Sequence, residues 1–274
     1  MTNATTGVPQ SFTLGREKLD LKFRFARLVA REWLAPDYVR VRLEGADLVD
    51  FGTPGHDDHI RVFFAQGPAD TVDEMRAFPS RELTPLYWGT SNSADGETVG
   101  WLDLEFAVHG DEGVAGVWAA NAPLGSLAGV GGPRGSMSVH GTPDAWLLAG
   151  DETAVPQIRR FAALIPDGAP ATILVEVQDE AHEVAIDAPV TVEYVHRGDA
   201  AAGTALAARL DGITADDRPS GDVFGFVAAE QAIVKTGRAL LCERWGLDSD
   251  RVVVKGYWKR GEAEYHAPHG PGAR

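Results

Sequence analysis

Short stretches of alternating hydrophobic and polar residues fill the first half of the chain. Phe23 and Phe25 alternate with charged neighbours, and the same two-residue period recurs over 39–44, 60–64 and 102–108. This period puts one face of each stretch in a core and the other toward solvent, as in half-buried β-strands. Clusters of Gly, Pro, Asn and Asp separate the stretches and mark turns. The pattern predicts a small antiparallel β-barrel over residues 21–142.

The pattern of hydrophobic residues changes after residue 142. Continuous apolar runs, typical of strands buried on both faces, alternate with segments of helical character. We predict strands over 146–150, 171–177, 190–195, 223–228 and 251–257, and helices over 151–164, 203–210 and 230–245. This alternation is typical of a five-stranded parallel sheet with right-handed crossovers, here over residues 143–260. Such sheets bind ligands beyond the carboxyl ends of their strands.

The two ends of the chain lack these patterns. Residues 1–20 have neither a basic start nor an apolar segment, so we predict a disordered tail rather than a signal peptide. Residues 261–274 are rich in Gly and Pro and are predicted to be a second tail. No uninterrupted apolar run reaches the roughly 18 residues of a membrane span.

Charge and cysteine content exclude several classes of function. The formal net charge of −15 argues against nonspecific binding to DNA or to anionic membranes. Cys242 is the single cysteine, which excludes an intrachain disulfide, a Cys-ligated iron–sulfur cluster and a Cys-rich zinc site. We expect no metal site and a reducing, hence cytoplasmic, compartment.

The stretch from Trp101 to Ser136 carries the first candidate for binding chemistry. A predicted strand breaks at His109-Gly110 and is followed by an acidic turn, a short helical segment around 115–120 and a Gly-rich run over 125–135. A strand, a glycine turn and a helix start together can present backbone N–H groups to a phosphate. A β-hairpin with a helical excursion is the alternative. The chain contains no GxGxxG, Walker A, HExxH or GxSxG motif.

Five stretches, distributed over both predicted domains, resemble one family of flavoenzymes. They are DDHIRVFF at 57–64, EFAVHGDEGVAGVWA at 105–119, GVGGPRGS at 129–136, LAGDETAVP at 148–156 and GYWKRGEAEYH at 256–266. In this order they resemble the siderophore-interacting proteins, FAD-dependent ferric-siderophore reductases of the ferredoxin-reductase-like superfamily. The resemblance implies an FAD-binding barrel followed by a nicotinamide-binding-like α/β domain.

The resemblance also implies which residues hold the flavin. Arg81 would pair with the FAD pyrophosphate and Thr84 would hydrogen-bond the flavin ring, whereas a surface arginine and a strand threonine are the alternatives. His109 and the segment 113–118 resemble the family's pyrophosphate-binding turn, although Trp118 also fits a core position. The candidate cofactor residues are Arg81, Leu83, Thr84, His109, Gly113, Ala115, Gly116, Trp118 and Thr153. No side-chain nucleophile or general acid is required, so no catalytic residue is assigned.

Two departures from the family pattern stand out. Leu83 occupies the position where an aromatic side chain would lie against the flavin ring. An aromatic stack contributes about 0.5–1.5 kcal/mol beyond area burial, so its loss should weaken FAD binding or shift the reduction potential. Tyr87 or Trp88 are candidates to replace it. The second departure is Ala228-Ala229-Glu230, where relatives tend to have Gly before Glu.

The remaining candidates concern the electron donor and the substrate. Asp151, Glu152 and Glu230 are expected at the NAD(P)H site, with helix capping as the alternative. Ferric siderophores are oxygen-ligated and often anionic complexes, and reduction to Fe(II) loosens their hold on the metal. Four basic residues occupy family-like positions for a substrate patch, with solvated surface charges as the alternative: Arg61, Arg134, Lys259 and Arg260.

The sequence therefore predicts an NAD(P)H:ferric-siderophore oxidoreductase that passes electrons through FAD to siderophore-bound Fe(III). Two alternatives stay open: a ferric-siderophore-binding protein with weakened flavin binding, and a flavin reductase with another acceptor. NADH, NADPH and a ferredoxin-like protein are each compatible with the sequence as electron donor.

Overall fold

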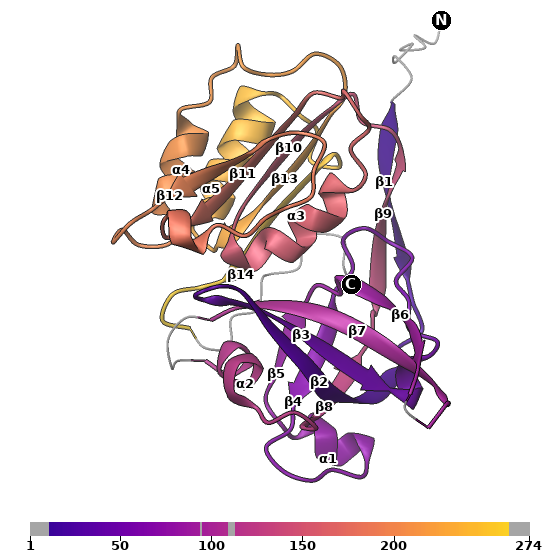
Figure 1. The fold of residues 1–274 in the computed structure, drawn as a ribbon. Helices are drawn as coiled ribbons and strands as arrows, with labels where there is room; N and C mark the ends of the chain where they lie inside the picture. Colours follow the sequence, from indigo (N-terminus) through magenta and orange to yellow (C-terminus); the bar gives the residue numbers. More distant parts are fainter. Residues whose placement is uncertain (1–10, 94, 109–112, 263–274) are drawn as a thin grey trace, which may run out of the picture.

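The computed structural model describes residues 11–93, 95–108 and 113–262. Its described part contains two sheets that lie one above the other, with a two-stranded ribbon beside them (Figure 1). The lower layer is antiparallel and the upper layer is parallel, as the hydrophobic patterns predict. No helix of the described residues has the length and apolar content that a membrane span needs.

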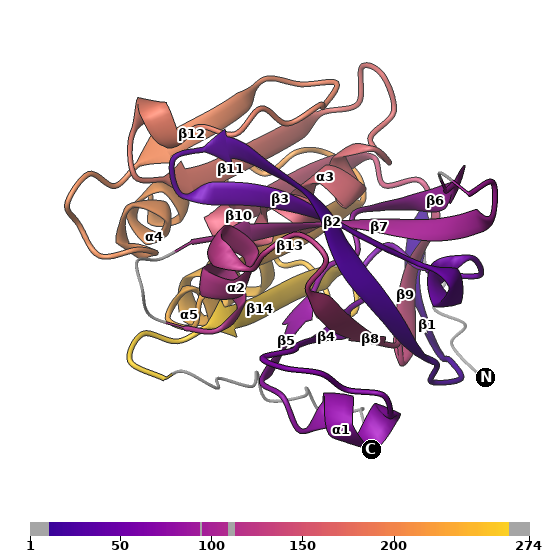
Figure 2. The same ribbon diagram turned by 60° about the horizontal axis from the view of Figure 1, so that its bottom comes forward.

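The antiparallel sheet forms a curled half-barrel of seven strands in the order β5-β4-β8-β2-β3-β7-β6 (Figures 1 and 2). Its inward-facing residues make a core in which Val39, Val41, Val62 and Leu102 are fully buried. The strands are β2 (Phe23–Ala35), β3 (Tyr38–Gly45), β4 (Ile60–Phe64), β5 (Ser80–Leu83), β6 (Tyr87–Asn92), β7 (Thr98–Ala107) and β8 (Leu127–Gly131). Two short helices, α1 (Val72–Arg76) and α2 (Ala115–Asn121), cover parts of the barrel.

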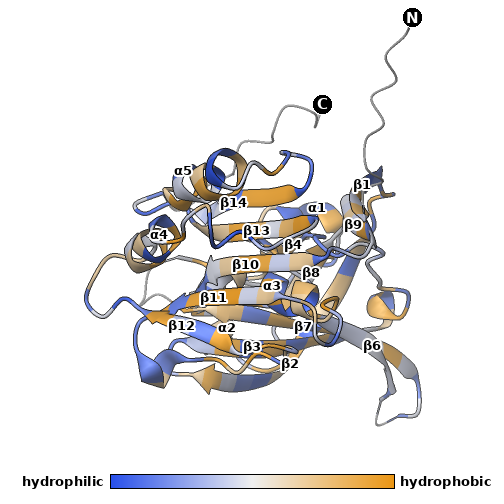
Figure 3. Cartoon of the chain, turned by 90° about the horizontal axis from the view of Figure 1, so that it is seen from above, coloured by the Kyte–Doolittle hydropathy of each residue, from blue (hydrophilic) through white to orange (hydrophobic). Residues whose placement is uncertain are grey.

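The parallel sheet has five strands in the order β12-β11-β10-β13-β14. Its strands are β10 (Ala145–Asp151), β11 (Ala171–Val177), β12 (Val192–His196), β13 (Val223–Glu230) and β14 (Val252–Trp258). Helix α3 (Val155–Ala162) lies on the face toward the barrel, and α4 (Thr204–Asp211) and α5 (Ile233–Arg238) lie on the other (Figures 1 and 3). The strand order reverses beside β10, which is the point where such sheets bind ligands.

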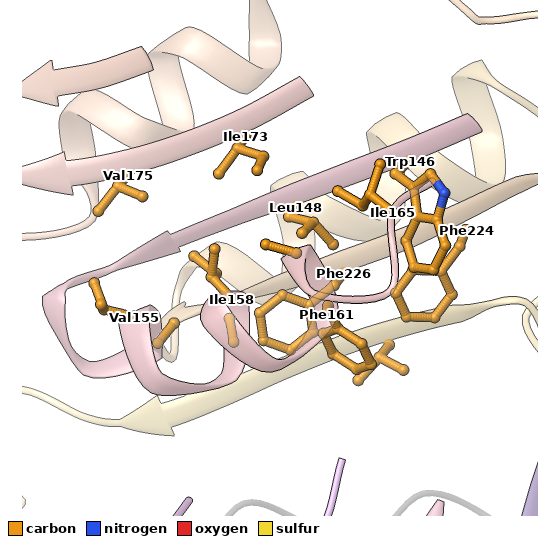
Figure 4. Packing of buried hydrophobic residues seen from close by; sticks show 14 of the residues in the cluster. Trp146, Leu148, Val155, Ile158, Phe161, Ile165, Ile173, Val175, Phe224 and Phe226 are labelled. Carbon is orange, nitrogen blue, oxygen red and sulfur yellow. The ribbon is translucent and has the colours of Figure 1, made fainter. Parts of the chain in front are cut away.

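Helix α3 joins the two layers. Ile158 and Phe161 on the helix pack against Leu148, Phe224 and Phe226 of the sheet (Figure 4). Rings of Phe161 and Phe226 lie 5.1 Å apart between centroids. Much of β10, β11 and β13 is orange in Figure 3, as expected of apolar strands buried on both faces.

Three predicted elements differ from the structure. Residues 12–18, inside the predicted disordered tail 1–20, form strand β1 (Phe12–Lys18), which pairs antiparallel with β9 (Gly135–Gly141). The helix predicted over 151–164 is a 3-10 turn, Glu152–Ala154, followed by the shorter α3. The helix predicted over 230–245 is α5 followed by a π-helical segment, Ala239–Arg244. Residues 263–274 of the predicted C-terminal tail lie outside the described residues.

Candidate functional site

The first group of candidate residues lies on β5, an edge strand of the half-barrel. Antiparallel pairing with β4 sets Arg81 opposite Val62 and Leu83 opposite Ile60. Leu83 is half-buried and packs against the barrel core, whereas Thr84, directly after the strand, is buried at 8% exposure. Arg81 donates from Nη1 to the Ser80 carbonyl at 2.7 Å. This strand therefore presents Arg81 and Thr84 at one edge of the barrel.

The second group surrounds the start of α2. Gly113 has φ of +91°, a left-handed conformation that favours glycine, and open space lies where its Cβ would be. A Cβ on Gly116 would come within 3.0 Å of the Ala107 carbonyl, so glycine lets α2 lie close to the end of β7. No side chain caps this helix start, where Ala115 is the first residue. His109 lies outside the described residues.

Trp118 sits in the barrel core. Its ring lies 5.2 Å from that of Phe64, and the residue is 9% exposed. The indole Nε1 is buried without a hydrogen-bond partner among the described residues. Trp118 thus occupies the core position considered for it. Its indole N–H is the one polar group of the side chain, and it has no partner among the described residues.

Asp151 organises the carboxyl end of the parallel sheet. Its Oδ1 accepts hydrogen bonds from the Thr153 backbone at 3.0 Å and from the Thr153 hydroxyl at 2.5 Å. Its Oδ2 accepts from the Trp258 indole at 2.8 Å and from the Glu230 backbone at 3.1 Å. Asp151 is fully buried, so this carboxylate holds the ends of β10, β13 and β14 together. The Glu230 carboxylate accepts from the backbone of Ala232 at 2.7 Å.

Glu152 belongs to a buried network of charges at the same edge. Arg197 Nη1 lies 2.5 Å from a Glu152 oxygen and 3.9 Å from a Glu176 oxygen. Glu176 also accepts from the backbone of Gly203 at 2.5 Å. Burial, with Asp151 nearby, raises the pKa of Glu152 to about 7 despite the opposing charge of Arg197. The carboxyl end of the sheet thus holds a glutamate that titrates near neutral pH.

A third group, which the sequence analysis did not assign, joins the two layers. Lys255 on β14 donates to Asp57 Oδ2 at 2.6 Å, and its Nζ lies 2.8 Å from His59 Nε2. The ring of Tyr257, two residues further on, meets that of His59 edge-on at 6.1 Å. Burial raises the pKa of Tyr257 well above its ordinary value, Asp57 and Asp151 add to the rise, and the Thr84 side chain opposes it. The motifs at 57–64 and 256–266 contain Asp57, His59 and Tyr257, and Lys255 directly precedes the second motif, but nothing in either motif indicates that these residues meet.

The predicted basic patch is distributed over several elements. Arg61 on β4 bonds the Ser80 hydroxyl at 3.1 Å and lies 3.2 Å from Glu82. Arg134 is exposed and follows the cis Gly132-Pro133 bond. Lys259 pairs with Glu262 at 2.6 Å, and Arg260 donates to the Ala202 carbonyl at 3.2 Å. Arg61 lies opposite Gly131 in the β4–β8 register, which places it beside β8, the strand that leads to Arg134.

Tyr87 and Trp88, considered as replacements for the missing aromatic, lie elsewhere. They line an interdomain cavity of about 600 Å³ together with His56, Arg159 and Arg160. Trp88 packs edge-on against Phe51 at 5.9 Å, with the Arg160 guanidinium 5.3 Å from the centre of its ring. The aromatic ring that the structure places near Thr84 is that of Tyr257.

Comparison with known proteins decides the family. A siderophore-interacting FAD-binding domain matches residues 27–137, and a siderophore-interacting protein domain matches residues 143–261. An NADPH-dependent ferric-chelate reductase from Escherichia coli K12 is 30% identical over 273 residues, which cover 93% of this chain and 98% of the relative. The chain belongs to the siderophore-interacting protein family.

Two further known proteins resemble the chain over most of its length. Ferric vibriobactin reductase ViuB of Vibrio cholerae is 28% identical over 261 residues, covering 89% of this chain and 92% of that protein. The crystal structure of a siderophore utilization protein from T. fusca superposes with a TM-score of 0.77 at 31% identity, covering 92% and 98% of the two chains. The half-barrel and the parallel sheet therefore have the arrangement of a known family member.

The residues of this family member fit an FAD. Flavin and diphosphate groups need cationic and hydroxyl donors, and Arg81, Thr84 and Tyr257, around β5 and the end of β14, are side chains of these kinds. The Tyr257 hydroxyl is buried and faces Thr84, yet it has no hydrogen-bond geometry to any described residue. A buried hydroxyl without a partner is rare unless a ligand or water completes it.

Proposed function

We propose that the protein is an FAD-dependent reductase that uses NAD(P)H to reduce siderophore-bound Fe(III) and so releases Fe(II). One observation supports this most. The barrel edge with Arg81 and Thr84 meets the carboxyl end of the parallel sheet, because Tyr257 faces Thr84 and Lys255 bonds Asp57 at 2.6 Å. A flavin held at the barrel edge would thus lie where the sheet binds its own ligand.

Each part of the chain has a defined task in this proposal. Bound FAD supplies the redox chemistry, accepting two electrons from a nicotinamide and giving single electrons to iron. Arg81 holds a phosphate, the start of α2 with Gly113 and Gly116 lets the backbone approach, and Thr84 orients the ring. Thr153 lies in the turn that follows β10, with its hydroxyl fixed by Asp151 at 2.5 Å.

The nicotinamide would enter beyond β10 and β13. Asp151 has both oxygens engaged within the protein, so its task is to hold the sheet ends rather than to contact the dinucleotide. Glu230 likewise accepts on both oxygens, from the backbone of Ala232 and of Arg260, so Glu152 is the acidic candidate left to contact the dinucleotide. The names of relatives point to ferric vibriobactin and to a ferric chelate as substrates and to NADPH as donor in those proteins. The single cysteine suits a reducing compartment, and we place the reaction in the cytoplasm.

Anaerobic spectroscopy of the purified protein tests the proposal. We expect a yellow protein that contains about one FAD per chain, that NADH or NADPH bleaches, and that a ferric siderophore restores to the oxidised spectrum with formation of Fe(II). A protein that neither contains nor takes up FAD would favour the binding-protein alternative. Flavin bleaching without any reaction with ferric siderophores would favour a reductase for another acceptor.

The basic patch is the candidate substrate contact. At a net charge of −15 the protein as a whole repels an anionic chelate, so productive approach needs local positive charge. Single replacement of Arg61, Arg134, Lys259 or Arg260 by glutamine should slow flavin-to-iron electron transfer for anionic chelates but not for neutral ones. The loss should shrink with salt, because the Debye length falls to about 3 Å at 1 M.

The matched control is Arg209→Gln, which removes an exposed arginine paired with Glu193 on the far side of α4. It should leave transfer to both kinds of chelate unchanged. Equal losses for anionic and neutral chelates in the patch variants, or the same loss in the control, would show that the four residues are ordinary surface charges.

A further inference from the structure

A single arginine of α3 binds two separate segments of the barrel. Arg160 Nη1 donates to the Pro85 carbonyl at 2.7 Å. Its Nη2 donates to the Thr53 hydroxyl at 3.1 Å and to the Gly55 carbonyl. The planar fork of a guanidinium can hold both segments at once, whereas the ammonium of a lysine is a single point charge. Arg160 therefore fixes the distance between Pro85 and the segment 53–55.

The guanidinium is held in one orientation by groups that carry no charge. Its three acceptors are two carbonyls and a hydroxyl, although the residue is half-buried. Burial lowers the pKa of Arg160, and the charges of Asp58 and Asp57 oppose this shift. Asp58 is fully buried and accepts from the Thr53 hydroxyl at 2.5 Å, so Thr53 links it to Arg160. On another side the guanidinium lies 5.3 Å from the centre of the Trp88 ring. A partly buried cation is costly unless it is well bound, and these contacts bind it.

One of the two segments directly follows the candidate contact of the flavin ring. Pro85 comes after Thr84, and a proline restricts the backbone of the residue before it. Leu86, on the other side, donates from its backbone to the Asp103 carbonyl on β7 at 3.2 Å. Thr84 itself is 8% exposed. With the Pro85 carbonyl held by Arg160, the Thr84 side chain has little freedom to move.

We propose that Arg160 is a positioning residue of the flavin site, which acts through the Pro85 carbonyl to hold Thr84 against the flavin ring. This assignment rests on the proposed function. Helix α3 starts directly after the turn that contains Thr153, at the end of β10. Gln157, one turn before Arg160, is fully buried and donates to a barrel carbonyl at 2.5 Å, so the helix itself is fixed to the barrel. Arg160 thereby keeps the barrel half of the flavin site in place relative to the half at the end of the parallel sheet.

A double-mutant cycle on FAD affinity tests this assignment. FAD is titrated into the apoproteins of the wild type, Arg160→Met, Thr84→Val and the double variant, with flavin fluorescence as the signal. Each single variant should weaken FAD binding by about tenfold, the upper size of one lost hydrogen bond. If Arg160 acts through Thr84, the double variant should bind FAD like either single variant. A loss in the double variant that is the product of the two single losses would overturn the assignment.

The same titration separates the assignment from the proposed function. Wild-type apoprotein that does not bind FAD would overturn the proposed function itself. Wild-type binding together with an Arg160→Met variant of equal affinity would overturn only the role of Arg160.

Arg218→Met is the matched control for the loss of a half-buried arginine. Arg218 also donates to three acceptors on the backbone, the carbonyls of Trp245, Pro219 and Gly221, at 3.0, 2.9 and 3.2 Å. It precedes the amino end of β13, whereas the candidate flavin site adjoins the carboxyl end of the sheet. This variant should leave FAD affinity unchanged. A tenfold loss here as well would show that FAD binding responds to any such arginine, and would overturn the assignment.

The reduction potential of the bound flavin gives a readout that a purely structural role would not move. Spectroelectrochemical titration of the holoproteins should show Arg160→Met and Thr84→Val shifted in the same direction, with no further shift in the double variant. A tenfold change in the relative affinity for oxidised and reduced flavin corresponds to about 30 mV for a two-electron couple. Shifts of opposite sign in the two single variants would overturn the assignment.

A measurement on the wild-type apoprotein tests the arrangement without any flavin or variant. A guanidinium whose two Nη atoms have different acceptors cannot rotate freely, so nitrogen NMR should resolve separate Nη1 and Nη2 signals for Arg160. One averaged signal would rule out the simultaneous bonds to Pro85 and to the segment 53–55, and with them the positioning role.

Discussion

Replacing Glu105 with glutamine is expected to destabilise the protein far more than the loss of one surface charge would. The Glu105 side chain on β7 is fully buried and accepts from Tyr38 at 2.8 Å, from Arg40 at 2.6 Å and from Arg159 at 3.2 Å. Arg159 comes from α3, so this carboxylate ties the barrel to the parallel-sheet layer. Arg159 is only 10% exposed and would stay behind as an uncompensated charge.

The magnitude follows from that geometry. Breaking a buried ion pair by removing one partner costs about 3–5 kcal/mol, whereas an exposed pair contributes about 0–1 kcal/mol. For a protein of this size each kcal/mol corresponds to roughly 2–4 °C in Tm, so Glu105→Gln should lower Tm by roughly 6–20 °C. Urea unfolding followed by tryptophan fluorescence and calorimetry measures both quantities.

Glu193→Gln is the matched control for this experiment. It makes the same substitution in an ion pair with Arg209 at 2.6 Å, but with side chains 47% and 37% exposed. It should change stability by less than about 1 kcal/mol. Equal effects of the two variants would refute the view that the contribution of Glu105 to stability comes from burial at the interface rather than from ion pairing itself.

Three further outcomes are expected. Arg81→Ala should weaken FAD binding to the apoprotein by about 1.5–3 kcal/mol, measured by fluorescence titration, and undiminished affinity would show that Arg81 is not a phosphate ligand. Leu83→Tyr should tighten FAD binding or shift its reduction potential by no more than a single aromatic stack allows, and no change in either would place Leu83 away from the ring. The pKa of Glu152 is raised to about 7 in the folded protein, so its neutral form favours folding and the wild type loses stability as pH rises from about 4.5 to 7. The free energy of unfolding of Glu152→Gln, measured with urea, should therefore rise relative to that of the wild type by about 3 kcal/mol between pH 5 and 8. Parallel pH curves for the two proteins would contradict the shift in pKa.

The parallel sheet was the most predictable part of the fold. Its central strands β10, β11 and β13 are buried on both faces, so their apolar runs are continuous, and the predicted strand 171–177 coincides with β11. The π-helical segment after α5 was not predictable from a 3.6-residue period. Leu240 and Leu241 are both fully buried, but adjacent apolar residues also belong to the core-facing stripe of an ordinary α-helix, so they do not distinguish the two kinds of helix.

Long-range partners explain the other differences. Strand β1 looks like a polar tail in sequence, but Phe12 is 1% exposed and meets Phe224 edge-on at 6.1 Å. Its pairing partner β9 follows more than a hundred residues later, so no local signal reports it. The same holds for Lys255 and Asp57, which lie 198 positions apart and meet at 2.6 Å. The motif at 57–64 and the predicted strand 251–257 identify the two segments, whereas only the fold brings their side chains together.

The pairing of the basic residues bears on how an anionic chelate would bind. Arg61 and Lys259 already contact carboxylates, Glu82 at 3.2 Å and Glu262 at 2.6 Å. Both pairs are substantially exposed, so each is worth about 0–1 kcal/mol and a chelate bearing several anionic oxygens can displace the internal carboxylate at little cost. The same carboxylates regain their partners when the chelate leaves, which favours release. A patch that is internally paired therefore suits a substrate that must arrive and depart at a protein of net charge −15 better than a set of unpaired cations would.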